Sequence, residues 1–207
     1  RKKISWASPS CAPTSFGFQL ILVSELDIDG YDPETGALLW TEEGLDGEVA
    51  PSPAILNDTV FVANEYAMAT AISLSADGEE VTSEIAWQWH DFLPEVASPT
   101  SSPRHFYLAT SFGDFICLDA ETGETVWLEE FDRGFYSSPI RVGERLYVAD
   151  LRGTMHIMAT GGEFELLASM TFPEPVYATP AFLDGRIYVR TENRLVCIEN
   201  TEDHDGN

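Results

Sequence analysis

The sequence predicts an all-β fold, a β-propeller built from four-stranded antiparallel blades. A Ser-Pro or Thr-Pro pair recurs five times, and successive prolines are 44, 46, 40 and 41 residues apart. A period of about 40–50 residues is typical of one propeller blade. An aspartate, a Thr-Gly pair and a tryptophan also occur twice with identical spacing. The proline pairs are Ser8-Pro9, Ser52-Pro53, Ser98-Pro99, Ser138-Pro139 and Thr179-Pro180.

The first half of each repeat is interpreted as a strand, a tight turn and a second strand. Proline has no N–H, so it suits the start of an edge strand, and the innermost strand of a blade is such an edge. Short turns such as Asn57-Asp58 and Asp184-Gly185 contain residues that tolerate positive φ. Gly17 interrupts the pattern in the first repeat, so we expect a longer hairpin loop in that blade. In the other four repeats an aromatic residue follows the proline by eight positions, at Phe61, Tyr107, Tyr147 and Tyr188.

The second half of the repeat carries the tryptophan motif. We expect its aspartate to cap a turn through the carboxylate and its glycine to take the left-handed conformation that closes the hairpin. The tryptophan then lies in the outer strand, where its large face packs between neighbouring blades. We therefore expect Trp40, Trp87 and Trp127 to be buried. The two clear copies are Asp32, Thr35-Gly36 and Trp40, and Asp119, Thr122-Gly123 and Trp127.

The remaining repeats carry weaker copies of this motif. The second has an inserted polar turn around residues 77–80, and the fourth has Gly161-Gly162 as its turn with Leu166 in place of the tryptophan. The fifth ends at residues 196–199, where its last strand should begin. We therefore predict about four blades plus a partial fifth. Short strands and regular turns also suit an all-β sandwich, but a fixed period with a recurring tryptophan favours the propeller.

Composition narrows the classes of function. The chain of 207 residues has 35 acidic and 11 basic side chains, a formal net charge of −24. Such a charge repels phosphate backbones and anionic lipid surfaces, which argues against nucleic-acid partners. Solubility in a salty or extracellular medium is the favoured explanation, and a specific cationic partner is the alternative. No segment has the length of a transmembrane helix and no signal peptide opens the chain, so no membrane insertion is expected.

The pattern of aspartate, Thr-Gly and tryptophan resembles the docking motif of PQQ-like, quinoprotein-type propeller repeats. The resemblance extends, with weaker copies, over residues 1–200, and residues 201–207 are interpreted as an acidic C-terminal tail. The chain is similar to bacterial PQQ-like repeat proteins, a family that includes the propeller lipoprotein of outer-membrane protein assembly. This resemblance implies a periplasmic or extracellular location and a ring of seven or eight blades, of which the chain is a fragment or an open arc. It also implies that a strand preceding Arg1 in a longer protein completes the fifth blade.

No catalytic, cofactor-binding or metal-ligating residues are predicted. If the resemblance extended to the quinoprotein dehydrogenases, the chain would hold PQQ and calcium beneath a pair of adjacent cysteines. Its cysteines, Cys11, Cys117 and Cys197, include no adjacent pair. Cys117 and Cys197 occupy the same position in two repeats, and we interpret both as small buried apolar side chains. The acidic run that begins at Asp27 and Asp29 lacks the ligand spacing of an EF-hand. None of the histidines pairs at metal-ligand spacing.

The favoured function is non-enzymatic, a binding or scaffold propeller that recognises a protein, peptide or polysaccharide. The alternatives are a fragment of a PQQ-dependent quinoprotein dehydrogenase and the sensor propeller of a larger signalling protein. The candidate binding elements lead into the inner strands, combine aromatic and acidic residues, and should gather at one end of the channel. Packing at blade junctions explains the same residues and is the favoured interpretation. These segments are 46–49, 92–95, 133–136 and 174–177.

Overall fold

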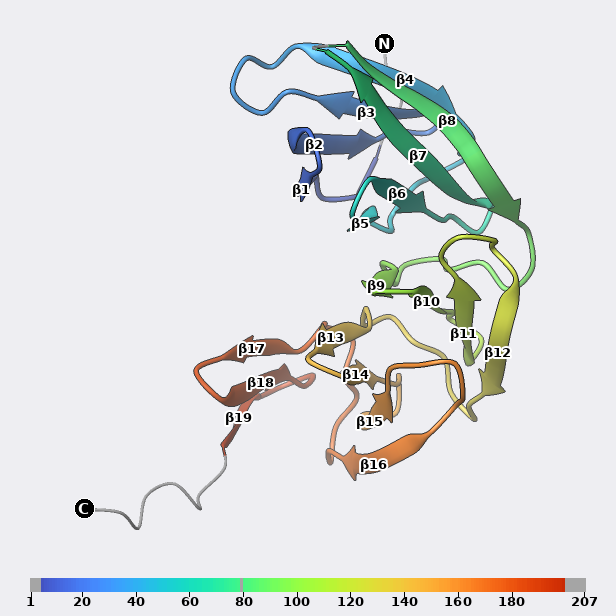
Figure 1. The fold of residues 1–207 in the computed structure, drawn as a ribbon. Helices are drawn as coiled ribbons and strands as arrows, with labels where there is room; N and C mark the ends of the chain where they lie inside the picture. Colours follow the sequence, from blue (N-terminus) through green and yellow to red (C-terminus); the bar gives the residue numbers. More distant parts are fainter. Residues whose placement is uncertain (1–4, 79, 200–207) are drawn as a thin grey trace.

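The computed structural model describes residues 5–78 and 80–199, and this part of the chain is all-β. It contains four four-stranded sheets and one three-stranded sheet. The sheets follow one another in an arc, with the first strand of each on the concave side and, in the four complete blades, the fourth strand on the convex side (Figure 1). The predicted propeller of four blades and a partial fifth is therefore confirmed. In these ranges no helix has the length and apolarity to cross a membrane, and the expected tail 201–207 lies outside them.

Each blade is an antiparallel meander in which consecutive strands pair. Blade 1 comprises β1 (Ser10–Thr14), β2 (Gly17–Val23), β3 (Asp27–Tyr31) and β4 (Leu38–Glu43). Blade 2 comprises β5 (Ala54–Leu56), β6 (Thr59–Val62), β7 (Ala69–Asp77) and β8 (Glu80–Trp89). Blade 3 comprises β9 (Thr100–Ser102), β10 (His105–Ala109), β11 (Asp114–Asp119) and β12 (Thr125–Glu130). Blade 4 comprises β13 (Ile140–Val142), β14 (Arg145–Ala149), β15 (Thr154–Ala159) and β16 (Leu166–Thr171), and blade 5 comprises β17 (Ala181–Leu183), β18 (Arg186–Arg190) and β19 (Leu195–Glu199).

The first hairpin of blade 1 differs from our expectation of a longer loop. Its turn has two residues, because Thr14 pairs directly with Gly17. The extra residues lengthen β1 and β2, so Ile21 occupies the place that Phe61 holds in blade 2. When extra residues continue an antiparallel ladder, their backbone N–H and C=O groups form hydrogen bonds with each other across the hairpin. In a longer loop these groups would have to form hydrogen bonds with water instead. The insertion in blade 2 is likewise mostly taken up by strand, as the long β7–β8 hairpin.

The turns between the third and fourth strands form as predicted. The Asp32 carboxylate accepts hydrogen bonds from the backbone N–H groups of Glu34 and Thr35, at 2.7 and 2.8 Å. Asp119 makes the equivalent bonds in blade 3. Gly36 has a φ of 72°, a left-handed conformation that other residues adopt only with strain. Both copies of the motif therefore build the same capped turn.

Apolar side chains fill the space between adjacent blades. Four clusters of buried residues form the core, one at each junction from blades 1 and 2 to blades 4 and 5. Phe61 of blade 2 stacks on Phe106 of blade 3, with ring centroids 4.3 Å apart and planes 19° apart. Phe115 to Leu118 are all completely buried, although their side chains alternate between the two faces of β11. Covering both faces of the sheet explains why this strand is apolar without alternation.

Hydrogen bonds between serine residues join the inner strands of successive blades. The backbone N–H of each Ser-Pro serine donates to the side-chain hydroxyl of the equivalent residue in the next blade, at 2.9 Å in all four cases. Sequence reasoning had explained the proline but not the hydroxyl residue before it. A hydroxyl in all five repeats was the signal that pointed to this contact. The bonds run from Ser8 to Ser52, from Ser52 to Ser98, from Ser98 to Ser138, and from Ser138 to Thr179.

The tryptophans dock in two different ways. Trp87 donates from Nε1 to the carbonyl of Ala120 at 3.1 Å, and Trp127 donates to Gly161 at 3.0 Å, so both reach the turn of the next blade. Both side chains are partly buried against the core clusters at these junctions, so they pack between blades as predicted but are less buried than expected. Trp40 is buried, as predicted, but it bonds Gln19 of its own blade.

The cause of this difference is the neighbouring hairpin. Blade 2 ends its third strand in the long β7–β8 hairpin and lacks the capped turn that blade 3 offers to Trp87. Trp40 folds over Gly30 of its own sheet, where a Cβ atom would lie within 2.1 Å of the indole. In blade 4, Ala168 rather than Leu166 occupies the position of the tryptophan, because it pairs with Ile157 as Trp127 pairs with Cys117. The assignment of Leu166 to that position is therefore wrong.

The equivalent cysteines have different surroundings. The register confirms that Cys117 and Cys197 share a position, since they pair with Tyr107 and Tyr188. Cys117 is completely buried, and burial raises the pKa of its thiol to about 12. Cys197 is exposed, so its predicted burial is wrong. Within the described residues, β19 has neither a fourth strand beside it nor a further blade against its outer face.

Candidate interaction surface

The two ends of the arc are built from different segments. One end, the connector end, carries the connectors between blades and the loops between the second and third strands of each blade. The other, the turn end, carries the tight hairpin turns within the blades. The connectors are residues 44–53, 90–99, 131–139 and 172–180, and the loops are 24–26, 63–68, 110–113, 150–153 and 191–194.

Exposed aromatic side chains gather at the connector end. In the described ranges, seven aromatic residues rank among the exposed large hydrophobic side chains, and all except Phe18 lie at or beside this end. The most exposed is Phe112, at 76%. Soluble proteins scatter single apolar residues over their surfaces, so the gathering of these aromatic residues at one end makes this end the candidate interaction surface. The six are Trp6, Tyr66, Phe92, Phe112, Tyr136 and Tyr177.

The predicted binding segments lie in the connectors, at this same end. The packing interpretation is confirmed for some of their residues, and the binding interpretation stays a prediction for the exposed ones. Val49, Phe135 and Val176 are completely or almost completely buried and pack at blade junctions. Phe92 and Tyr177 are exposed. The connectors therefore pack buried side chains at the blade junctions, and three of the four also present an aromatic side chain to solvent.

Tyr66 is held in a fixed place on the first connector. Asn64 donates from its amide to the carbonyl of Asp46 at 2.7 Å, which ties loop 63–68 to this connector. The Tyr66 ring covers Gly47, which has a φ of 74°, and a Cβ atom there would lie 3.1 Å from Cδ2 of the ring. The side chain is nevertheless 66% exposed. Its outer surface is thus presented to solvent on a rigid support.

Phe92 is the second unusual aromatic residue of this end. Its φ is 47°, a left-handed conformation that is rare for bulky side chains. Such conformations cost roughly 1–3 kcal/mol and cluster at functional sites. Phe92 is 47% exposed and lies near Trp89, with ring centroids 6.5 Å apart. The backbone strain therefore accompanies an aromatic ring that faces solvent.

Charge divides the molecule into two parts. Residues 4–103 contain 17 aspartates and glutamates and no lysine or arginine, whereas residues 104–207 contain 18 acidic and 8 basic side chains. Over blades 1 and 2 the connector end is consequently purely acidic. Sequence reasoning used the total charge and missed this asymmetry, although a count along the chain reveals it. The acidic residues in question are Glu25, Asp46, Glu48, Glu65, Asp91 and Glu95.

Over blade 5 the Glu174 carboxylate of this end is occupied. The Glu174 carboxylate accepts bonds from the Thr191 hydroxyl at 2.6 Å and the Asn193 backbone N–H at 2.9 Å, and it pairs with Arg194 at 3.3 Å. The Thr191 hydroxyl is the main cause that lowers the pKa of Glu174. By contrast, Oε2 of Glu65 is buried and has no hydrogen-bond partner in the described part of the chain.

A buried pair of a histidine and an aspartate lies at the junction of blades 3 and 4. His156 Nε2 is 3.1 Å from Asp150 Oδ2, and its Nδ1 is 3.4 Å from the Ser169 hydroxyl. Ser169, His156 and Asp150 follow one another in space like the nucleophile, base and acid of a catalytic triad. The contact between the serine hydroxyl and the histidine is long, however. Asp150 also caps its own hairpin, and the His156 ring packs on Phe131 at 4.5 Å. We assign the group to blade packing. Sequence reasoning missed it, because strand pairing rather than sequence spacing brings His156 and Ser169 together.

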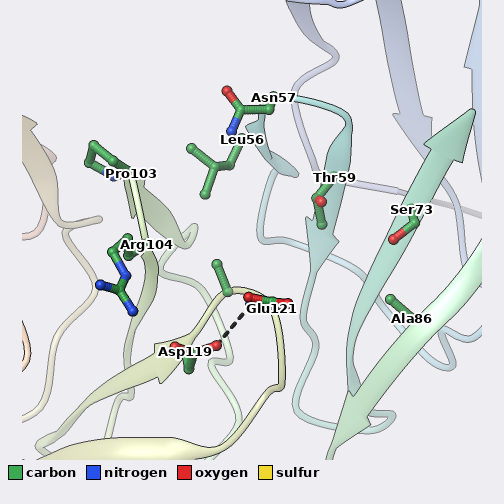
Figure 2. Close-up of a pocket in the computed structure, with 10 residues that line it drawn as sticks. Leu56, Asn57, Thr59, Ser73, Ala86, Pro103, Arg104, Asp119 and Glu121 are labelled. Atoms are coloured by element: carbon green, nitrogen blue, oxygen red, sulfur yellow. Dashed lines mark hydrogen bonds between the residues drawn. The ribbon is translucent and has the colours of Figure 1, made fainter.

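A cavity of about 290 Å³ opens at the turn end between blades 2 and 3. Figure 2 shows Arg104 and Asp119 on one side of it and Asn57, Thr59 and Ser73 on the other. Asp119 already accepts two backbone bonds in its own turn, one of them drawn to Glu121. The cavity therefore lies between the capped turn and the neighbouring blade, away from the aromatic residues.

In residues 5–78 and 80–199, no group of three or more His, Cys, Asp and Glu side chains is placed to hold a metal ion. Asp29, from the acidic run without EF-hand spacing, is buried and accepts hydrogen bonds from Tyr31 and Thr41. His90 follows β8 and is exposed, as expected for a loop or edge residue.

Comparison with solved structures shows the propeller fold. The BBS1N structure, solved in complex with ARL6DN and soaked with lead, has a TM-score of 0.67 at 14% identity; the match covers 90% of this chain and 59% of that one. The β-propeller domain of Cps50 (Swd1) from Myceliophteria thermophila has a TM-score of 0.60 at 13% identity, with coverage of 91% and 72%.

BamB from Moraxella catarrhalis is also similar, at 15% identity and a TM-score of 0.46, with coverage of 91% of this chain and 69% of that one. No curated protein sequence matches the chain. A family profile described as outer membrane protein assembly factor BamB does match, over residues 24–162. This match includes both clear copies of the tryptophan motif and spans more than half of the chain. The chain therefore belongs to the PQQ-like propeller family of the outer membrane protein assembly factor BamB.

Proposed function

We propose that this chain is a non-enzymatic scaffold propeller of the cell envelope that binds a protein partner through its connector end. The observation that carries the proposal is the gathering of exposed aromatic side chains at that end, with Phe18 alone at the other. Aromatic residues are enriched in the centres of protein interfaces, where they bury large areas at low entropic cost.

Family membership supports both the location and the kind of partner. The family description names an outer-membrane assembly factor, which fits a periplasmic or extracellular site of action. The BBS1N propeller, a neighbour in fold only, was solved in a complex with another protein. A peptide or polysaccharide ligand is a less favoured partner, because the exposed aromatic residues span several blades rather than lining one enclosed groove.

Site-specific crosslinking in the native host tests the proposal. A photoreactive amino acid placed at Phe112 or Tyr136, at the connector end, should trap a discrete protein partner. The same amino acid at Phe18 or Leu183, at the turn end, should not, although both positions are at least as exposed as Tyr136. Equal crosslinking from both ends, or none from either, would contradict docking at the connector end.

Calorimetry tests the non-enzymatic part of the proposal. We expect no heat of binding when PQQ and calcium are added to the folded protein, because the buried titratable groups at the blade junctions are engaged in packing and turn capping. Tight stoichiometric binding would revive the alternative of a quinoprotein dehydrogenase. The fold alone decides neither outcome, since one fold hosts many functions.

A further inference from the structure

We propose that the connector end of blades 1 and 2 binds a cationic segment of the partner, with an arginine or lysine of that segment over the ring of Tyr66. This inference rests on the proposed function. It specifies the chemistry of the partner segment that binds the connector end over blades 1 and 2. The site, called the acidic-aromatic patch, comprises Asp46, Glu48, Glu65, Tyr66, Asp91, Phe92 and Glu95.

Tyr66 has the properties of a cation-binding ring. It is 66% exposed on its outer side and packed against Gly47 on its inner side, so the ring is oriented before any ligand arrives. Asp46 and Glu48, on either side of Gly47, are both exposed. An aromatic face flanked by carboxylates attracts guanidinium and ammonium groups through the ring quadrupole and through charge.

Glu65 precedes Tyr66 in the same loop and adds a carboxylate to the patch. Its Oε2 atom is buried and accepts no hydrogen bond in the described residues, so no positive group there balances its charge. A buried charged group without a partner is costly. A bound arginine or lysine would compensate the negative charge of this loop, whereas a neutral apolar segment would cover further carboxylates without compensation.

Phe92 extends the patch toward blade 3. Asp91 and Glu95 lie in the same connector, and the ring is exposed despite a strained backbone. Over blades 4 and 5, by contrast, loops and connectors contain arginines, and Glu174 is already paired with Arg194. The cationic preference is thus confined to the part of the connector end whose described residues, 5–78 and 80–103, include no lysine or arginine.

The other possible occupants fit less well. A second copy of the chain would bring a charge of −24 against −24, so self-association through this patch is opposed by repulsion. A phosphate-bearing ligand meets the same repulsion. The patch therefore favours an extended protein segment rich in arginine or lysine.

Fluorescence anisotropy with a defined probe tests the proposal. The probe is a labelled eight-residue peptide of alternating arginine and alanine, and its control replaces each arginine by citrulline, which has the same shape without charge. We expect the arginine peptide to bind at least tenfold more tightly than the citrulline peptide in low salt, with partial loss of affinity in high salt. Equal affinity of the two peptides, or no binding of either, would overturn the proposal.

Matched variants separate the patch from the general negative charge. Tyr66→Ser and Glu65→Gln should each weaken arginine-peptide binding about five- to tenfold, because they remove the ring or a carboxylate charge of the same loop. Tyr177→Ser at blade 5 and Glu84→Gln on β8 serve as controls, and both should leave affinity unchanged. Equal loss in Glu65→Gln and Glu84→Gln would show that only net charge matters. If Tyr66→Ser lowers the melting temperature, Glu65→Gln still decides the question.

Two further results would assign the patch to another occupant. A dimer in sedimentation experiments that Glu65→Gln disrupts would assign it to a second copy. Binding that appears only after Arg1, Lys2 and Lys3 are changed to glutamine would assign it to the basic residues of the chain itself. Either result overturns the cationic-partner inference but leaves the proposed function intact, since the Phe112 and Tyr136 crosslinks test docking outside the patch.

Discussion

Blades 1 and 2 share strand order and register with blades 3 and 4, yet the two pairs differ in charge. Residues 4–103 carry acidic side chains without a single lysine or arginine, whereas the second part mixes both signs. In all four blades the ladder between the third and fourth strands shifts register at the same place, for example between Gly30 and Tyr31. The buried faces and backbone ladders therefore build the blade, and the surface charge is free to vary with function and environment.

The largest expected difference is in the loss of folding stability when tryptophans in different environments are replaced. Trp40→Ala should cost about 3–5 kcal/mol of stability, because the ring is buried and its removal leaves a cavity over Gly30. Trp127→Ala should cost less, about 2 kcal/mol, since that side chain is half-buried. Urea denaturation of both variants measures the difference. A larger loss for Trp127 would mean that docking on the next blade outweighs burial.

The serine bonds between blades should give the next largest effect. Ser98→Ala leaves the backbone N–H of Ser52 without its acceptor, which should cost about 1–3 kcal/mol. Ser75→Ala on the exposed β7–β8 hairpin is the matched control and should stay within about 0.5 kcal/mol of the natural protein. If the two variants melt alike, the interblade bond contributes nothing that water does not replace.

Salt should stabilise the molecule mainly through blades 1 and 2. Like charges repel there because residues 4–103 contain 17 acidic side chains and no lysine or arginine. The screening length falls from about 30 Å at 0.01 M salt to about 3 Å at 1 M. We expect a gain on the order of 1 kcal/mol over this range. Thermal melts of E43Q/D77N/E84Q should show a weaker salt dependence than those of E129Q/E130Q/E163Q in the second part. An equal dependence in both variants would remove the distinction between the two parts.

Acidification should give the smallest effect, and one shared by both parts. Backbone N–H groups, foremost that of Thr35 or Thr122, lower the pKa of Asp32 and of Asp119. A lowered pKa in the folded state means that stability is present above the unfolded value of about 3.9 and is lost as the pH falls through the folded pKa. Melting temperatures of Asp32→Ala and Asp119→Ala below about pH 4 should therefore fall less steeply with acid than those of the natural protein. An unchanged slope would show that these caps do not couple to folding.

The recurring motifs made the fold predictable. The Ser-Pro period and the capped turns at Asp32 and Asp119 are local, and local hydrogen bonds form as the sequence indicates. The blade number followed from the period alone. Errors arose where neighbours decide the outcome: the extended first hairpin at Gly17, the position of Ala168, and the exposure of Cys197.

The candidate surface was predictable only in part. The connector segments with Phe92, Tyr136 and Tyr177 were identified from the repeats, but Tyr66 and Phe112 were missed because they lie in loops between other strands. Those loops come to the same end only when the strands pair into sheets. The Oε2 atom of Glu65, which has no hydrogen-bond partner in the described residues, likewise has no sequence signal, since the packing around that atom buries it.

By itself, the sequence determined the repeat, the turns, the apolar strands and the separation of charge along the chain. These follow from local backbone preferences and from residue type. The tertiary structure decided which aromatic residues are buried and which face solvent, how each tryptophan docks, and which serine meets the next blade. The physical reason is that burial and hydrogen bonding between blades depend on groups about 40 residues apart, whose meeting depends on the length of every intervening hairpin.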